Sequence, residues 1–165
     1  MKLTIALMMA AAVAFADRGP GIMTNEALAP APAGQQHATG TFDIKVTPLP
    51  ASESGGGLGR LAIEKQYHGD LEGRGAGEML TSGPPPGPNG SGGYVAIERV
   101  TGTLNGRSGS FVLQHSGTAT RGKTTLSVTV VPDSGTGELA GLAGSMTIKM
   151  EAGKHSYDLA YSLQP

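Results

Sequence analysis

The sequence contains no cysteine, and aromatic residues make up only 4% of its 165 residues. Without cysteine the chain has no disulfide, no zinc–thiolate site and no cysteine nucleophile. Charged residues are also few, at 15%, and they nearly cancel to a formal net charge of -1. There is no basic run with interleaved aromatic residues, which is the usual footprint of nucleic-acid binding. We therefore expect no nucleic-acid partner.

Glycine and proline are abundant, with 27 and 11 residues respectively. A composition rich in turn-forming residues and poor in charge is typical of β-proteins rather than of helical bundles. A length of 165 residues fits one folded domain.

The first residues, MKLTIALMMAAAVAFAD, predict a signal peptide over residues 1–16. A lysine, an apolar run too short to span a membrane and an A-F-A cleavage motif follow one another. We expect cleavage after Ala16, hence a periplasmic or secreted protein with no stable membrane anchor. Residues 17–36 are rich in Gly, Pro and Ala, which predicts a disordered linker before a β-barrel domain at 37–165.

From residue 37 onward, apolar and polar residues alternate with the period of two that is typical of β-strands. No window after the signal peptide shows the 3.6-residue period of a helix. Short strands joined by tight turns predict an all-β fold, an eight-stranded antiparallel closed meander barrel. The eight runs span residues 41–46, 60–67, 71–80, 94–100, 110–116, 124–131, 145–150 and 156–163.

The stretch GTATRGKT, residues 117–124, matches the G-x-x-x-x-G-K-[ST] phosphate-binding motif. Such a loop holds a nucleotide where it follows a buried strand and begins a helix. Here strands are predicted on both sides, and the β-branched residues after Lys123 favour a strand. We interpret R-G-K as a hairpin turn and expect no bound nucleotide. The sequence contains no other cofactor motif, so we expect no cofactor. His37, His68 and His155 lack the spacing of metal ligands, so we expect no metal and place these histidines on the surface.

Asn105-Gly106 is the strongest hairpin signal in the chain. A two-residue turn there pairs Glu98 with Leu113. One face of this hairpin carries the larger side chains, which predicts that it points into the barrel. The opposite face is also partly apolar, which indicates that another subunit covers it in a homo-oligomer. The predicted inward face consists of Tyr94, Glu98, Val100, Phe111, Leu113 and His115.

A second turn, at Gly69-Asp70, is predicted to pair Lys65 with Arg74. In that register Lys65, Arg74 and Glu78 point into the barrel, while the glycines of the run GRGAG point outward.

Charged groups inside an apolar barrel need partners, because burial without one is costly. They are either ion pairs that fix the strand register or a pocket in which a carboxylate and cations act on a ligand. The candidate catalytic residues are Glu98, Glu78 and His115. The candidate ligand-binding residues are Lys65, Arg74, Tyr94, Phe111 and Leu113.

Three blocks of sequence resemble a bacterial family, domain of unknown function 3224. They are KQYHGDLEGRGAGEML, IERVTGTLNGRSGSFVLQHSGTATRG and VVPDSGTGELAGLAGSM, and the resemblance spans residues 37–163. The family implies an allene oxide cyclase-like barrel, whose relatives, the allene oxide cyclases and dirigent proteins, are oligomers that hold lipophilic ligands. It implies no activity, and no catalytic residue of those relatives is transferred. The loop at 81–93 departs from the family by its extra prolines, either as a flap at the barrel mouth or as a permissive loop.

Three functions are open at this point. The favoured one is an exported barrel that binds a small lipophilic molecule in its interior. The second is a cofactor-independent isomerase, cyclase or lyase, in which Glu98 or Glu78 moves a proton, Lys65 and Arg74 bind an anionic oxygen, and His115 tunes the carboxylate. The third is a structural, oligomeric interaction domain. An apolar pocket around Glu98 would support the first two, and a fully packed interior would remove both.

Overall fold

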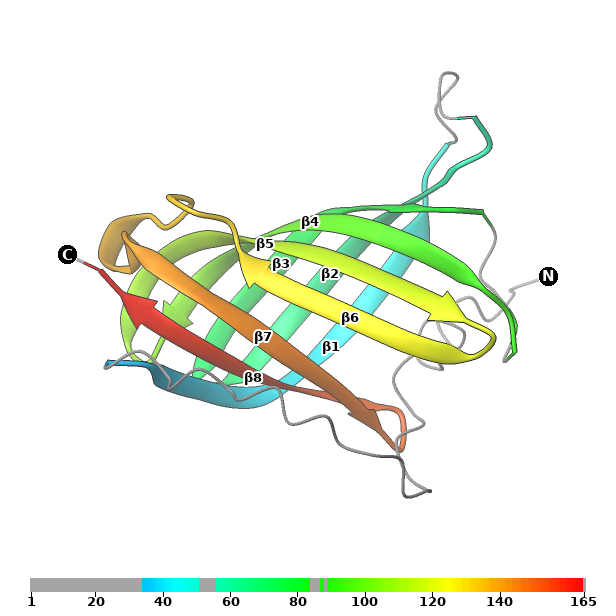
Figure 1. The fold of residues 1–165 in the computed structure, drawn as a ribbon. Coiled ribbons are helices and arrows are strands. Elements are labelled where there is room, and N and C mark those ends of the chain that lie inside the picture. The colour runs from blue at the N-terminus through cyan, green and yellow to red at the C-terminus, as the bar shows by residue number, and fades with distance from the viewer. Residues whose placement is uncertain (1–33, 51–55, 84–86, 88, 165) are drawn as a thin grey trace.

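A computed structural model describes residues 34–50, 56–83, 87 and 89–164, which form a closed antiparallel β-barrel (Figure 1). Each strand pairs with the next along the chain, and β8 pairs with β1 to close the barrel. The predicted fold is confirmed, and each of the eight predicted runs forms a strand. The strands are β1 (Gln36–Pro48), β2 (Gly59–Gly69), β3 (Leu71–Thr81), β4 (Gly92–Leu104), β5 (Arg107–Thr120), β6 (Lys123–Val130), β7 (Leu142–Glu151) and β8 (Lys154–Leu163).

The predicted signal peptide and nearly all of the predicted linker lie outside the described residues, as does part of the proline-rich loop at 81–93. The first strand begins at Gln36. Within the part of the chain that is described, no helix is long and apolar enough to cross a membrane.

Two hairpins have the turns that the sequence predicts. Asn105 and Gly106 have φ angles of 48° and 81°, and Arg121 and Gly122 have φ angles of 49° and 82°. Positive φ at both central residues is the requirement of a type I′ turn, which suits the twist of a two-stranded hairpin. The phosphate-binding motif therefore spans the end of β5, a tight turn and the start of β6. The absence of nucleotide binding stays a prediction.

The β2–β3 register is one residue away from the predicted one. Lys65 lies opposite Gly75 rather than Arg74. Asp70, the one residue between β2 and β3, is tied to β1, where its carboxylate accepts hydrogen bonds from the backbone N–H and hydroxyl of Thr39. Leu71 then points into the core and is completely buried.

A shift of one residue turns every side chain of a strand to the other face. Arg74 and Glu78 therefore lie on the outside of the barrel, with side chains 77% and 58% exposed. Their predicted place in the interior is wrong. The glycines of β3, predicted to face outward, point inward instead.

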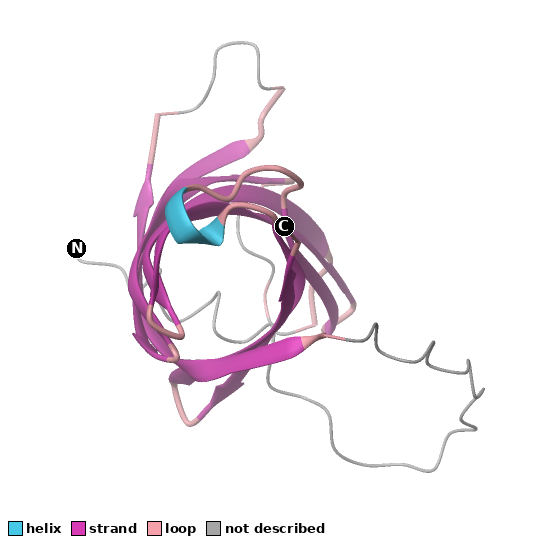
Figure 2. Ribbon diagram, turned by 90° about the vertical axis from the view of Figure 1, so that its left-hand side faces the viewer, coloured by secondary structure: helices cyan, strands magenta, loops and turns pink. Residues whose placement is uncertain are grey.

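The two ends of the barrel differ. At one end the connection between β6 and β7, which contains the short 3-10 helix η3 (Gly137–Leu139), lies over part of the rim (Figure 2). Leu139 of η3 is buried in the main core cluster. Most inward apolar side chains near this end are fully buried. They include Leu71, Leu104, Phe111, Leu113, Leu159 and Tyr161, while Leu163 is partly buried.

The opposite end is more open. The β5–β6 and β7–β8 turns lie there, and β6 and β7 separate toward it (Figure 1). In the described chain these two strands pair only at Thr129 and Ser145. Several apolar side chains at inward positions near this end are only half-buried. They are Ile44, Val46, Leu61, Tyr94, Ile148 and Met150. We call this end of the barrel the mouth.

Candidate functional site

Glu98 of β4 lies at the centre of a buried polar network below the mouth. Its side chain is completely buried, and the Asn-Gly hairpin places it inward, opposite Leu113, as predicted. One carboxylate oxygen, Oε1, accepts a hydrogen bond from the Tyr67 hydroxyl at 2.9 Å. The other, Oε2, lies 2.7 Å from Nζ of Lys65 and 3.0 Å from Nε2 of His115. Three side chains from β2 and β5 thus converge on one carboxylate.

The electrostatic balance keeps Glu98 ionised. Burial alone raises the pKa of a carboxyl group, but the positive charge of Lys65 and the hydrogen bonds from His115 and Lys65 outweigh it here. Together they lower the pKa of Glu98 from 4.5 to about 2. Burial, and then the negative charge of Glu98, raise the pKa of Tyr67 well above 10, so the phenol stays a hydrogen-bond donor.

Lys65 contacts several other side chains of the network. Besides Glu98, its ammonium donates a hydrogen bond to the Tyr67 hydroxyl at 3.2 Å. It also lies 4.7 Å from the centre of the Phe42 ring, within the range of a cation–π interaction. Phe42 in turn stacks on His155 with ring centres 4.9 Å apart. Burial, and then the charge of Lys65, lower the pKa of His155.

Gly75 of β3 makes room for the carboxylate. A Cβ atom at this position would overlap Oε1 of Glu98 and would also crowd the Tyr67 ring. The corrected β2–β3 register places this glycine inward, opposite Lys65. The glycine-rich run GRGAG therefore gives the network its space.

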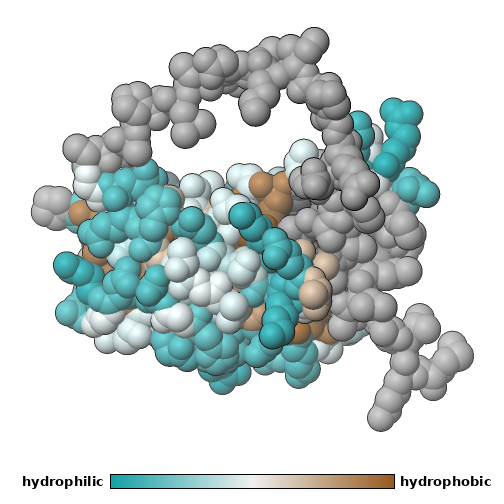
Figure 3. Space-filling view, turned by 90° about the horizontal axis from the view of Figure 1, so that it is seen from below, coloured by the Kyte–Doolittle hydropathy of each residue, from teal (hydrophilic) through white to brown (hydrophobic). Residues whose placement is uncertain are grey.

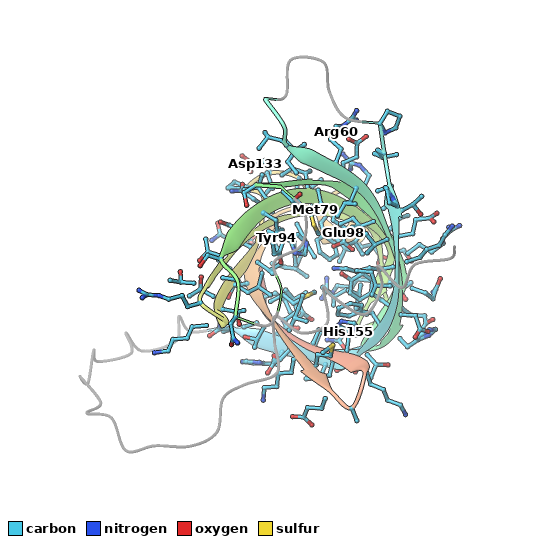
Figure 4. The ribbon with its side chains drawn as sticks, turned by 90° about the vertical axis from the view of Figure 1, so that its right-hand side faces the viewer. Arg60, Met79, Tyr94, Glu98, Asp133 and His155 are labelled. Atoms are coloured by element: carbon cyan, nitrogen blue, oxygen red, sulfur yellow. The ribbon has the colours of Figure 1, made fainter. Side chains whose placement is uncertain are left out.

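The mouth lies above this network. Seen through that end, Met79, Tyr94 and Glu98 lie inside the ring of strands, whereas Arg60 lies outside it (Figure 4). The Tyr94 ring occupies the space that a Cβ would fill at Gly117, so the ring packs against β5. Burial raises the pKa of Tyr94 to about 12, which keeps its hydroxyl neutral. At this end Ile44, Val46, Leu61, Ile148 and Met150 place apolar side chains at inward positions, and Tyr94 and His155 add polar ones.

The structure brings some of the predicted site residues together and separates others. Glu98, Lys65 and His115 form the network, and Tyr94 lies nearby in the mouth. Phe111 and Leu113 point inward but are sealed in the main core cluster. The two remaining residues lie outside: Glu78 pairs with Arg60 at 2.7 Å, and Arg74 lies 4.0 Å from Glu64.

Sequence reasoning missed several partners in the network. No local pattern around Tyr67 indicates that its hydroxyl donates a hydrogen bond to Glu98, on a strand far away in the sequence. Phe42 and His155 meet through the β1–β8 pairing, which joins the two ends of the domain. His155 was expected on the surface, and it is instead partly buried against Phe42.

The outer surface is mostly hydrophilic on the face seen in Figure 3. An apolar groove of about 760 Å³ lies on the outside of β3 and β4, between Leu58, Leu80, Val95 and Ile97. The Arg60–Glu78 pair borders it. Within the described ranges, no three His, Asp or Glu side chains gather as metal ligands would.

Comparison with known proteins gives a family. No curated protein matches the chain. A crystal structure of a protein of unknown function from the DUF3224 family of Shewanella oneidensis MR-1 is similar to it, with 48% identity and a TM-score of 0.72. That match covers 79% of this chain and 98% of the Shewanella chain. The model of the family "Protein of unknown function (DUF3224)" matches residues 38–161. The chain therefore belongs to the DUF3224 family.

Proposed function

We propose that this protein is an exported barrel that binds a small lipophilic molecule in its mouth, above the Glu98 network. The difference between the two ends of the barrel carries this proposal. Near η3 most apolar side chains at inward positions are fully buried, with Leu163 as an exception, whereas several at the mouth are only half-buried. Half-buried apolar surface that faces inward is what an apolar ligand covers.

The Glu98 network supports such a site because it fixes the side chains that lie below the mouth. Every side-chain polar atom of Glu98, Lys65 and Tyr67 has a partner within the network, so these buried side chains are held in fixed positions below the mouth. The resemblance to allene oxide cyclase-like barrels, whose relatives hold lipophilic ligands, points to the same use. Export rests on the predicted signal peptide.

Proton transfer by Glu98 is a weaker candidate function. A general base works best when its pKa lies near the working pH, whereas the pKa of Glu98 is about 2. Both oxygens of the carboxylate already accept hydrogen bonds from the protein. Glu78 and Arg74, the other candidates for proton transfer and anion binding, lie outside the barrel. Binding is therefore better supported than catalysis by these residues.

Binding is tested with the neutral fluorescent lipophile N-phenyl-1-naphthylamine. We expect saturable binding to the wild-type protein, and binding weakened about tenfold or more in Ile148→Gln. Ile148 is half-buried in the mouth, and the change replaces apolar contact area with a polar amide. Absence of saturable binding to the wild type would reject the proposal.

The matched control is Ile97→Gln, because Ile97 is 52% exposed in the outer groove. It should leave probe binding unchanged. If Ile97→Gln weakens binding and Ile148→Gln does not, the probe occupies the outer groove and the mouth is not the site.

A further inference from the structure

We propose that the polar end of the bound molecule is a hydroxyl group, which donates a hydrogen bond to Nδ1 of His115. This inference rests on the proposed function and names the class of ligand: a neutral lipophilic alcohol or phenol.

The contact with Glu98 fixes which ring nitrogen of His115 carries hydrogen. Nε2 lies 3.0 Å from Oε2 of Glu98, an ionised carboxylate oxygen that can only accept. Nε2 must therefore be the donor. In a neutral imidazole the other nitrogen then has a lone pair and acts as an acceptor.

The surroundings of His115 keep the ring neutral. Burial lowers the pKa of His115, Glu98 opposes this, and the positive charge of Lys65 lowers it further, so the pKa falls below 6.5. At neutral pH the ring therefore has one N–H, on Nε2, and one bare acceptor, Nδ1.

This acceptor lacks a partner within the described residues, although His115 is only 4% exposed. In the same part of the chain, no side-chain nitrogen or oxygen atom is both sealed from solvent and without a hydrogen bond. Nδ1 therefore borders accessible space. The ring of His115 projects from β5 on the inner face, opposite Ala96 and two residues from Gly117, where the Tyr94 ring lies.

The charges of the network favour a neutral ligand over an anionic one. The ammonium of Lys65 is already neutralised by Glu98, and it contacts the Tyr67 hydroxyl and the Phe42 ring. A carboxylate beside Nδ1 would face its lone pair, and the ammonium of Lys65 is already paired with Glu98. A hydroxyl group can donate to Nδ1, and Tyr94, whose hydroxyl has no hydrogen bond to a described residue, offers a second polar group on the same wall.

The test compares three ligands of similar length as competitors of N-phenyl-1-naphthylamine: 1-decanol, methyl decyl ether and decanoate. The ether keeps the oxygen acceptor but has no O–H, so it measures the donated hydrogen bond alone. We expect 1-decanol to displace the probe at about tenfold lower concentration than the ether, since one buried hydrogen bond is worth about that factor. In His115→Phe the two should compete equally.

A second measurement needs no variant that must fold. The Nδ1 signal of His115 in ¹⁵N NMR should have the shift of a bare acceptor in the free protein and should move on addition of 1-decanol but not of the ether. Equal competition by alcohol and ether in the wild type, or best competition by decanoate, would overturn the hydroxyl assignment while leaving lipophile binding intact. Failure of the probe itself to bind would overturn both.

Discussion

Glu98→Gln is expected to lower the free energy of unfolding by about 3–5 kcal/mol, the usual cost of breaking a buried ion pair by removing one partner. The amide keeps the volume of the side chain but not its charge. Lys65, whose side chain is only 4% exposed, then has no anionic partner within the described chain. Urea denaturation of both proteins measures the difference in the free energy of unfolding, provided that its slope against urea concentration is the same in both.

The control is Glu78→Gln. Glu78 also pairs with a cation at 2.7 Å, but its side chain is 58% exposed, so water screens the interaction. Loss of an exposed pair costs about 1 kcal/mol or less. Equal effects of the two substitutions would contradict the assignment of Glu98 to the interior and Glu78 to the outer surface.

Glu98→Gln should also change how the stability of the fold depends on pH in acid. The pKa of Glu98 is lower in the folded barrel, about 2, than its ordinary value of 4.5, so its ionised form stabilises the fold above pH 4.5. That stabilisation is lost as the pH falls from 4.5 toward 2, and the shift corresponds to about 3 kcal/mol. The loss should be present in the wild type and absent in Glu98→Gln. A loss of equal size in both proteins would assign the acid sensitivity to other carboxylates.

The sequence predicts the inward place of Glu98 because the signal is local. The Asn105-Gly106 turn leaves one register for β4 and β5, and alternation does the rest. Period-two patterning likewise predicts all eight strands, since each strand of a barrel has one face toward the interior and one face toward solvent.

The predicted register of the β2–β3 hairpin is wrong, and a contact distant in the sequence lies at its turn. Asp70 bonds to Thr39 of β1, and this interaction is invisible in the sequence around Gly69. A local signal did exist: only the observed register turns Leu71 and Met79 inward together with Lys65. Weighing those two apolar residues above the two-residue turn would have placed Arg74 and Glu78 outside.

Gly75→Ala should destabilise the barrel by about 3 kcal/mol or more, which is large for a single methyl group. The added Cβ would overlap Oε1 of Glu98 and crowd the Tyr67 ring. Overpacking a core typically costs about 1–3 kcal/mol. Here the overlapped atom cannot turn aside freely, because Tyr67, Lys65 and His115 hold the carboxylate in place. Displacement of Glu98 therefore adds the cost of weakening a buried ion pair.

The matched control for this change is Gly93→Ala, in β4 of the same barrel. A Cβ there would meet nothing closer than 3.5 Å, an ordinary contact. Its effect should lie within about 1 kcal/mol and can be stabilising, because alanine restricts the unfolded chain. In Gly75→Ala, but not in Gly93→Ala, the stability lost between pH 4.5 and 2 should also shrink, since a displaced Glu98 regains a more ordinary pKa. If Gly75→Ala is as mild as Gly93→Ala, the network does not depend on the space at Gly75.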